Sequence, residues 1–528
     1  MRQLKRITAA CGALSIMVSA MMVLPVAHAA GNVIVGTTDT VNTLDPARCY
    51  NFYCSNVLHS VGQTLVNYPP GSSHLAPELA KSMPTVSNNG LTYTFKLRHG
   101  VTFQNGSKLT SKDVKFSLRR ALWINDPEGA GFLLSDIKTI DTPSPYTVVI
   151  HLKSRDITFT SKLAYTVATI LPTNAYSSPT KPIPDDAKPS VYRKYLSENF
   201  VGSGPYKIAN FRHDQSMLLT TWKGYSGKAP SNSKVLIRFY AKSSQLLVAL
   251  KSGEVDVAFR SFTTAQRHNL EKDPAVNTFK GAGATIRYLV FNPHLKPSGQ
   301  LKVRQAVAAA INRKRIIKND LGGAAKPLYS MVPPLFKDAN IPAFKELYGG
   351  KKASDYLKHK VNLTLWYSRG HYGPNEPSFA QTVKRTLEET GLFNITLKSS
   401  EWAQFTANAY PGPSGQYAAF LMGWYPDYLD PDDYLAPFYD SHASFLRMYD
   451  NPTMDQLLHE EATANSPTSG KRLKTFAKIQ KLAAKDVPIV PLYVLTPYAF
   501  ARTDISGVGK TMGPAQIFRY SVLSKSGN

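Results

Sequence analysis

Hydrophobic residues follow two different periods along this chain, and the alternation of these periods limits the fold more than any other feature. Apolar side chains recur at every second position over 91–97 and again over 146–152, which is typical of strands with one buried face. Between them, 109–122 places apolar residues three or four positions apart, which predicts a helix. Helical spacing returns over 301–317, and over 473–495 a helical stripe leads into a strand. Helices and strands therefore alternate, which predicts an α/β or mixed α+β fold.

Local signals support parts of this pattern. Thr110 stands at an N-cap position, and Asp113 three residues later can complete a capping box. Three polar stretches rich in Pro or Gly, 177–190, 201–206 and 291–300, are candidate hinges. The last follows an apolar strand, where a chain can cross between lobes. A chain that crosses more than once builds one lobe from separate segments, an architecture suited to closing around a ligand.

The N-terminus has the pattern of an export signal. Residues 1–6 are cationic, 7–26 carry no charge, and Ala-His-Ala at 27–29 supplies small residues for cleavage. We expect cleavage after about Ala29 and export to the periplasm. The alternative is an uncleaved membrane anchor, since the apolar run is long enough to span a bilayer.

Two cysteines remain after the leader, Cys49 and Cys54, five positions apart. In an oxidising compartment they could form a local disulfide that stabilises the fold by about 1 to 3 kcal/mol. The alternative is two reduced, buried cysteines on one helical turn. The spacing does not match a C-x-x-C redox motif.

The net charge of the chain excludes few classes of function by itself. The chain has 62 Lys and Arg against 36 Asp and Glu, a net charge of +26. The basic residues are dispersed and form no long block, so we interpret them as solvated surface and expect no nucleic-acid partner.

One acidic loop concentrates unusual chemistry. Residues 423–434, "GWYPDYLDPDDY", place four aspartates among aromatic residues and prolines. A metal loop, a catalytic acid cluster and a socket for a cation are the three possible interpretations. A calcium loop beginning at Asp430 would have Tyr434 at position five and Leu435 in place of the required glycine. We predict no metal.

Enzyme signatures fail elsewhere in the chain. "GVGKT" at 507–511 would need the first phosphate-loop glycine at Asp504, and "HEEAT" at 459–463 lacks the second histidine of a zinc protease. Ser414 lacks the G-x-S-x-G frame. We therefore predict no enzyme activity, no catalytic residues and no cofactor.

Several segments, in this order, resemble the extracytoplasmic solute-binding proteins of peptide and nickel ABC transporters. They are "TLDPARCYNFYCSNVLHSVGQTLV", "LAPELAKSMPTVSNNGLTYTFKLRHGVTFQNGSKLTSKDVKFSLRRAL", "VGSGPYKI", "LKSGEVDVAF", "YLVFNP", "LKVRQAVAAAINR", "EWAQF", "GWYPDYLDPDDYL" and "IQKLAAKDVPIVPLY". Each is weakly specific alone, but together they span nearly all of the chain after the leader.

The resemblance implies a two-lobed periplasmic-binding-protein fold with two hinge strands and an extra subdomain. After the signal peptide at 1–29, lobe I would combine segments 30–64, 195–285 and 501–528. The extra subdomain would occupy 65–194, and lobe II 286–500.

The resemblance also implies site residues. In peptide-binding members the aspartate of the G-W-x-x-D motif, here Asp427, holds the ligand's ammonium group, and Trp424, Tyr425 and Trp402 match residues that line the peptide. Arg369 lies near the position where dipeptide binders hold the ligand's carboxylate, which favours short peptides. The alternatives are a cap or loop role for Asp427, ordinary core positions for the tryptophans and a surface position for Arg369.

The predicted function is binding of short peptides between the lobes and their delivery to membrane permease subunits by a monomeric protein. A first alternative keeps the fold but binds a metal chelate, glutathione, an opine or an oligosaccharide. A second alternative is an exported hydrolase that uses the loop aspartates as acid and base.

Overall fold

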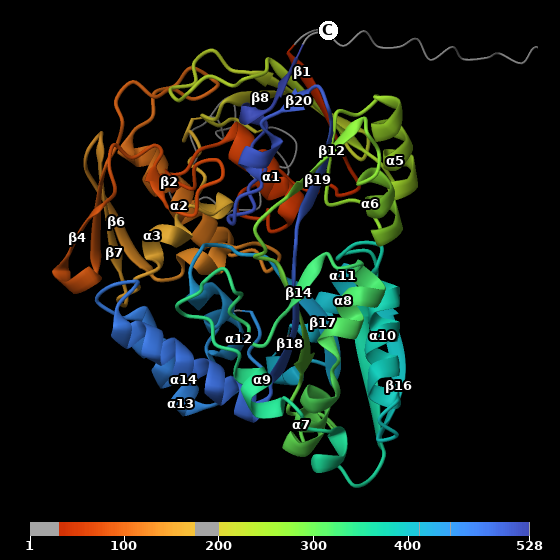
Figure 1. Ribbon diagram of the computed structural model, residues 1–528. Coiled ribbons are helices and arrows are strands. Elements are labelled where there is room, and N and C mark those ends of the chain that lie inside the picture. Colours follow the sequence, from red (N-terminus) through yellow and green to blue (C-terminus); the bar gives the residue numbers. More distant parts are fainter. Residues whose placement is uncertain (1–30, 175–199, 411, 444, 527–528) are drawn as a thin grey trace, which may run out of the picture.

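The computed structural model describes residues 31–174, 200–410, 412–443 and 445–526, and its largest sheet has seven strands. The upper half of Figure 1 holds this sheet. Its central strand is parallel to both neighbours, while the other pairs are antiparallel. In sheet order the strands are β12 (Val276–Lys280), β19 (Tyr498–Arg502), β11 (Val257–Phe259), β1 (Asn32–Thr37), β10 (Lys234–Phe239), β9 (Ser216–Thr221) and β8 (Tyr206–Arg212).

A six-stranded mixed sheet fills the lower half of Figure 1. Its strands are β14 (Ala325–Pro327), β18 (Ile489–Leu495), β13 (Ile286–Phe291), β17 (Ala419–Trp424), β15 (Val361–Ser368) and β16 (Phe393–Ser400). All residues of β13 and β17 are buried, as expected of central strands covered on both faces.

A third unit lies at the left of Figure 1. It contains β4 (Thr85–Ser87), β5 (Thr92–Lys96), β7 (Thr147–Leu152) and β6 (Ile137–Ser144), with α2 (Ser111–Ile124) beside them. The capping box predicted for α2 is present, with Thr110 as N-cap and Asp113 at N3. Two small sheets pair β2 (Val66–Asn67) with β3 (Ala76–Pro77) and β20 (Ile505–Ser506) with β21 (Ser524–Lys525).

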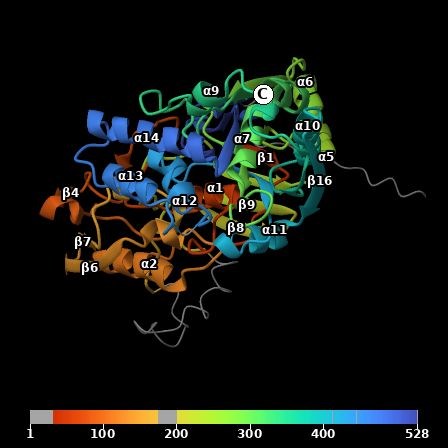
Figure 2. The ribbon, with the colours of Figure 1, turned by 90° about the horizontal axis from the view of Figure 1, so that it is seen from below.

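Helices surround the sheets, and α5 and α10 lie on the opposite side of the molecule from the four-stranded sheet (Figures 1 and 2). The remaining α-helices are α1 (Phe52–Val61), α3 (Phe159–Lys162), α5 (Ser243–Ser252), α6 (Thr264–Leu270), α7 (Leu301–Ala310), α8 (Arg313–Leu321), α9 (Ala343–Tyr348), α10 (Glu376–Glu388), α11 (Trp402–Ala409), α12 (Ala436–Tyr439), α13 (Pro452–Ala462) and α14 (Gly470–Asp486). No helix within the described ranges is both long and apolar enough to cross a bilayer.

The chain crosses between the two large sheets at two places. One crossing joins β12 to β13 and the other joins β18 to β19. They run side by side, since the Gly281 amide donates to the Pro497 carbonyl at 2.9 Å and the Leu495 amide donates to the Thr285 carbonyl at 2.8 Å. The prediction of a crossing at 291–300 is wrong, because β13 already belongs to the second sheet.

Two other candidate hinges have different outcomes. The stretch 201–206 leads into β8, and 177–190 lies outside the described residues. The boundary expected at 500 falls inside β19, which pairs with β11 and β12 of the seven-stranded sheet.

The four-stranded unit also contacts the helices of the second large sheet. The Ile157 amide donates to the Ala462 carbonyl at 2.9 Å, and Arg155 Nη2 donates to the Ala464 carbonyl at 2.9 Å.

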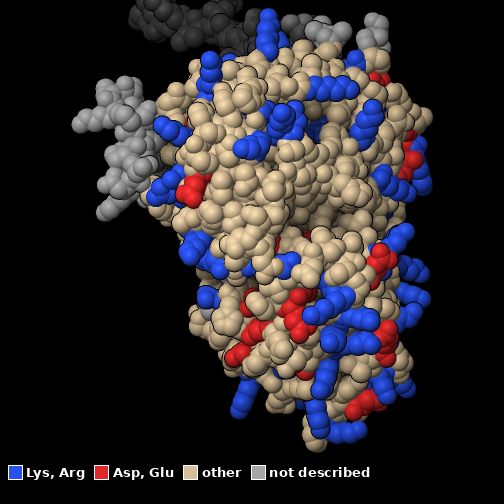
Figure 3. Space-filling model, turned by 90° about the vertical axis from the view of Figure 1, so that its left-hand side faces the viewer, with Lys and Arg blue, Asp and Glu red and all other residues tan. Residues whose placement is uncertain are grey.

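Basic side chains are dispersed over the face shown in Figure 3, with acidic ones between them on its lower half. That distribution agrees with a solvated surface on this face.

Candidate binding site

The acidic loop begins where β17 ends. Strand β17 finishes at Trp424, and the chain then leaves the six-stranded sheet and contacts α1 and α3 before the 3-10 helix η6 (Pro431–Tyr434). Asp430 is the N-cap of η6 and accepts a hydrogen bond from the Asp432 amide at 2.9 Å. The loop is therefore fixed at both ends.

Asp427 is the carboxylate at the centre of this loop. Its side chain is buried, and Oδ2 accepts a hydrogen bond from the Tyr50 hydroxyl at 3.0 Å. Oδ1 is also buried and has no hydrogen-bond partner, and no Lys, Arg or His forms an ion pair with Asp427 within the described ranges. Burial raises the pKa of Asp427 to about 8, while the Tyr50 hydrogen bond opposes the rise.

Asp433 binds the backbone amide of Asp427 and so fixes its position. Its Oδ2 accepts from the Trp424 indole Nε1 at 3.2 Å and from the Asp427 backbone amide at 3.0 Å. Its Oδ1 is buried without a partner. Burial raises the pKa of Asp433 well above its usual value, and the neighbouring charge of Asp427 adds to the rise. Two buried carboxyl groups thus lie together, and no ion pair with either of them is present in the part of the chain that the structure describes.

The other two aspartates have partners. Arg472 binds Asp430 with both terminal nitrogens at 2.8 and 2.9 Å, and its Nε donates to Glu461 at 3.0 Å. Asp432 accepts from the Tyr428 hydroxyl at 2.6 Å. Asp430 and Asp432 therefore fix the loop in place, whereas Asp427 and Asp433 have no cationic partner among the described residues.

A small cavity adjoins Asp427. Its volume is about 30 Å³, which leaves room for ordered water. Segments 52–59, 164–165, 425–429 and 515–517 line it, together with Tyr68. These segments come from the regions of the seven-stranded sheet, the four-stranded unit and the six-stranded sheet, so the cavity lies where all three meet.

Aromatic hydroxyls connect the walls of the cavity. The Tyr425 and Tyr165 hydroxyls lie 3.2 Å apart, and Tyr165 is 3.4 Å from the Ser55 hydroxyl. The Tyr50 ring packs edge-on against Tyr165 at 5.9 Å. Polar groups thus line one side of an otherwise aromatic enclosure, as is common in solute sites.

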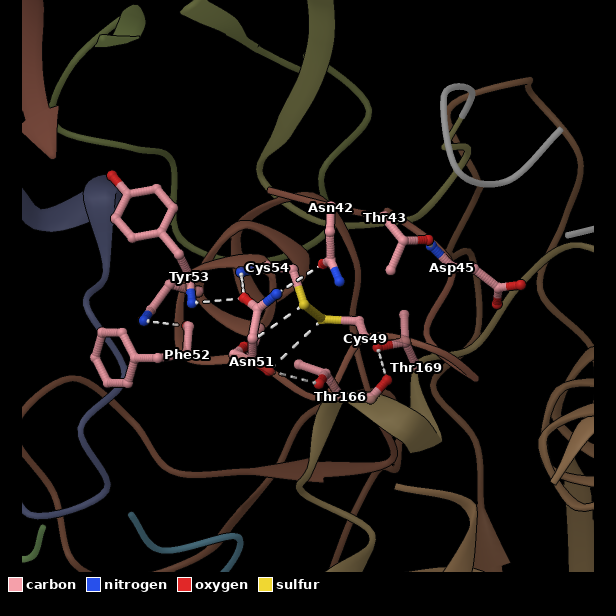
Figure 4. The surroundings of a disulfide bond; sticks show 12 residues. Asn42, Thr43, Asp45, Cys49, Asn51, Phe52, Tyr53, Cys54, Thr166 and Thr169 are labelled. Carbon is pink, nitrogen blue, oxygen red and sulfur yellow. Dashed lines mark hydrogen bonds between the residues drawn. A yellow bond between two sulfur atoms is a disulfide. The ribbon is translucent and has the colours of Figure 1, made fainter. Parts of the chain in front are cut away.

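Sequence reasoning missed Tyr50, which lies 377 positions from Asp427. A disulfide joins Cys49 and Cys54 at the start of α1 (Figure 4). Tyr50 lies within the short loop of chain that this disulfide closes. Asn51 caps α1, since its Oδ1 accepts from the Tyr53 and Cys54 amides at 3.1 and 2.9 Å. The available signal was an aromatic residue between two nearby cysteines and followed by a helix cap.

The remaining predicted residues do not line the cavity. Trp424 is buried in the core of the six-stranded region, with ring centroids 5.0 Å from Phe438 and 4.8 Å from Phe445. The structure therefore brings Asp427 and Tyr425 together in the cavity wall, while Trp424 lies behind them.

Trp402 and Arg369 lie in a neighbouring region of the second sheet. Trp402 begins α11 and is half-buried, with its ring stacked on His371 at 3.5 Å. Arg369 is exposed and forms an ion pair with the exposed Glu401 at 3.3 Å.

One group within the described ranges has metal-type ligands. Asp440, His442 and Asp455 place ligand atoms within 4.8 Å of one another near the surface. Ser441 already donates to both Asp455 oxygens, at 2.9 and 2.7 Å, and the group does not line the cavity. Hydrogen bonding within the loop accounts for this arrangement.

Comparison with known proteins identifies the family. Residues 74–445 match the family described as "Bacterial extracellular solute-binding proteins, family 5 Middle". The probable D,D-dipeptide-binding periplasmic protein DdpA of Escherichia coli is 25% identical over 516 residues, covering 95% of this chain and 96% of the relative. The glutathione-binding protein GsiB of Escherichia coli is 28% identical over 512 residues, covering 92% and 93%.

Solved structures share the fold. The dipeptide-binding protein of a Pseudoalteromonas species, in complex with Met-Leu, superposes with a TM-score of 0.80 at 19% identity over 94% of this chain and all of the other. DppA of Helicobacter pylori, in complex with the peptide STSA, gives 0.77 at 23% identity, covering 94% and 98%. The predicted two-lobed fold is confirmed, and this chain belongs to the family 5 bacterial extracellular solute-binding proteins.

Proposed function

We propose that this protein binds short peptides outside the cytoplasmic membrane and delivers them to the permease of an ABC importer. Family membership supports solute binding, and the names of relatives that bind dipeptides or glutathione support a peptide-like solute. The protein would bind without chemical turnover, act as a periplasmic monomer after loss of its leader, and need no nucleic acid.

The observation that carries the proposal is the unpartnered Oδ1 of Asp427 in the wall of a buried cavity. A buried carboxylate without a cation is unfavourable in a closed protein, and an α-ammonium group from the solute would supply the missing charge. Tyr50 would keep Oδ2 occupied, which leaves Oδ1 for the solute. Every peptide with a free N-terminus carries this group.

The lobes would move to admit the solute, because a cavity of about 30 Å³ cannot hold a peptide. Lobe I would comprise 30–64, 195–285 and 501–528, lobe II 286–500 and the extra subdomain 65–194. The two adjacent crossings next to Gly281 and Leu495, which run in opposite directions, would form the hinge.

The other predicted residues have different proposed roles. Tyr425 would contact the solute directly, and Trp424 would position Asp427 through Asp433. Trp402 and Arg369 would contact solutes that extend beyond the cavity towards α11.

Calorimetric titration with trialanine and N-acetyl-trialanine tests the ammonium socket. The wild-type protein should bind the free amine at least 30-fold more tightly, because an unpaired buried charge costs about 2 to 5 kcal/mol. Asp427→Asn should remove this preference. Asp338→Asn removes one exposed carboxylate and should behave as wild type.

Equal affinity of the wild-type protein for the two peptides would contradict the socket. Binding of neither, together with a different solute retained in native mass spectrometry, would favour a metal chelate, opine or oligosaccharide. Recovery of intact peptide after incubation tests the absence of turnover, and cleaved peptide would favour the hydrolase.

A further inference from the structure

A second charged group, Arg260, lies at the junction of the lobes. Arg260 follows β11 at the end of a buried strand of the seven-stranded sheet, and its side chain is exposed. Within the described ranges its guanidinium forms no hydrogen bond and no ion pair with the protein. Its contact is with the Phe52 ring, whose centroid lies 3.8 Å from Cζ.

The surroundings of Arg260 place it beside the Asp427 cavity. Phe52 lines that cavity, and its ring packs edge-on against Tyr425 at 5.8 Å. The charge of Arg260 also affects His371, which lies in the region of the six-stranded sheet. Burial, together with the charges of Arg287 and Arg260, lowers the pKa of His371 to about 3. The guanidinium therefore faces residues of both lobes.

The backbone at Arg260 is held in a left-handed conformation. Its φ is +67°, a region that costs a non-glycine residue about 1 to 2 kcal/mol. The preceding Phe259 is buried and stacks on Phe518 at 4.8 Å, which fixes the end of the strand. Strain of this kind is retained where a side chain needs a particular direction, and it is frequent at ligand sites.

Other arginines near the junction are already engaged. The terminal nitrogens of Arg519 donate to the His59 carbonyl at 2.8 Å and to Asn67 at 2.6 Å. Arg287 binds Glu376, and Arg369 is paired with Glu401. Arg260 has no such competitor, so its positive charge is available to a solute.

We propose that Arg260 binds the C-terminal carboxylate of the solute while Asp427 binds its ammonium group. This inference rests on the proposed peptide function and names a second subsite of the same cleft. Arg260 belongs to the region of the seven-stranded sheet and Asp427 to that of the six-stranded sheet, so a zwitterionic solute would connect charges on opposite lobes. A guanidinium that donates two parallel hydrogen bonds suits a carboxylate.

Titration with trialanine and trialanine amide tests this subsite, since both peptides keep the ammonium group. Wild-type protein should bind the acid about 10- to 100-fold more tightly than the amide, as expected for hydrogen bonds to a charged group. Arg260→Gln should remove the preference by weakening the acid while leaving the amide unchanged. Arg260→Lys, which keeps the charge, should retain part of it.

Arg385→Gln is the matched control, because it removes one exposed guanidinium from the last turn of α10, and it should behave as wild type. Arg369→Gln tests the other candidate position. Thermal unfolding without peptide checks that each variant folds. A preference that survives in Arg260→Gln, or disappears in Arg369→Gln alone, would overturn the inference while the peptide function stands. If wild-type protein binds neither peptide, the proposed function and this subsite are both wrong.

Discussion

Replacing Asp427 with Asn should stabilise the ligand-free protein at neutral pH, and its stability relative to wild type should rise with pH. Asp427 has a pKa of about 8 in the folded protein against 3.8 when unperturbed. A carboxylate whose folded pKa is raised binds its proton more tightly in the folded state. Stability is therefore highest below the unfolded pKa and falls as pH rises through the folded pKa.

The magnitude follows from that difference. At pH 7 the group lies about three pH units above its unfolded pKa, which corresponds to about 4 kcal/mol of lost stability. Asn cannot ionise, and its oxygen can still accept from Tyr50. Its amide nitrogen introduces buried donors that cost about 1 to 3 kcal/mol. We expect a net gain of about 1 to 3 kcal/mol at pH 7.

Urea unfolding of both proteins from pH 4 to 9 is the assay. Near pH 4 the variant should be about 1 to 3 kcal/mol less stable than wild type, because only the buried Asn donors then differ. Its stability relative to wild type should rise by up to about 1.4 kcal/mol per pH unit until about pH 8, and it should exceed wild type at pH 7. Asp433 will reduce this slope, because loss of the neighbouring charge lowers its own raised pKa. Asp338→Asn should follow the wild-type curve. Parallel curves for Asp427→Asn and wild type would refute the reasoning.

The same titration determines how peptide affinity depends on pH. An ammonium group next to Asp427 should lower its pKa, so binding near pH 6 releases close to one proton. Affinity should rise up to tenfold per pH unit towards pH 8 and weaken in acid. Calorimetry in two buffers with different ionisation enthalpies measures the released proton. The Asp427→Asn variant should release none, and proton release by that variant would contradict the assignment.

Three further variants test the support of the site. Tyr50→Phe removes the hydroxyl that stabilises ionised Asp427, and we expect about 10-fold weaker trialanine binding by calorimetry. Serine at both Cys49 and Cys54 should cost about 2 kcal/mol in urea unfolding, and added reductant should not destabilise that variant further. Arg472→Met leaves buried carboxylates unpaired and should cost about 3 to 5 kcal/mol in the same assay.

Local signals in the sequence predicted local structure well. The capping box of α2 was readable because its donor and acceptor lie three residues apart. The apolar stripe of Val303, Val307, Ala310 and Ile311 predicted a helix, and the structure has α7 there, followed directly by a second helix, α8. Asn312 separates them by accepting the Arg315 amide at 3.0 Å. A stripe of apolar residues continues through such a break, so periodicity cannot reveal it.

Pairings between distant segments were beyond that reasoning. The crossing was expected after the strand at 286–291, yet that strand pairs with β17 and β18 and so already belongs to the second sheet. Which sheet a buried strand joins depends on partners more than a hundred residues away. The hydrophobic pattern of the strand is the same in either sheet.

The candidate binding site also depends on contacts between residues that are distant in the sequence. The family motif pointed to Asp427, but nothing local showed that Tyr50 donates to it or that Arg260 lies across the junction. The sequence also did not show which of the four loop aspartates have partners, because Arg472, which binds Asp430, lies 42 residues after it. Adjacent, identical side chains acquire different roles from partners that only the tertiary fold supplies.

That difference among the loop aspartates suggests how binding and closure are coupled. Arg472 pairs with Asp430 outside the cavity, so we expect this contact to hold the loop in place in both the open and the closed arrangement. In the closed arrangement the Asp427 carboxyl group must therefore remain protonated or acquire a cation. In the proposed mode of binding, a solute ammonium would remove that penalty and a solute carboxylate would pair with Arg260 on the opposite lobe. Closure would then be favourable when one molecule carries both charges, which gives selectivity for zwitterions without contact to any peptide side chain.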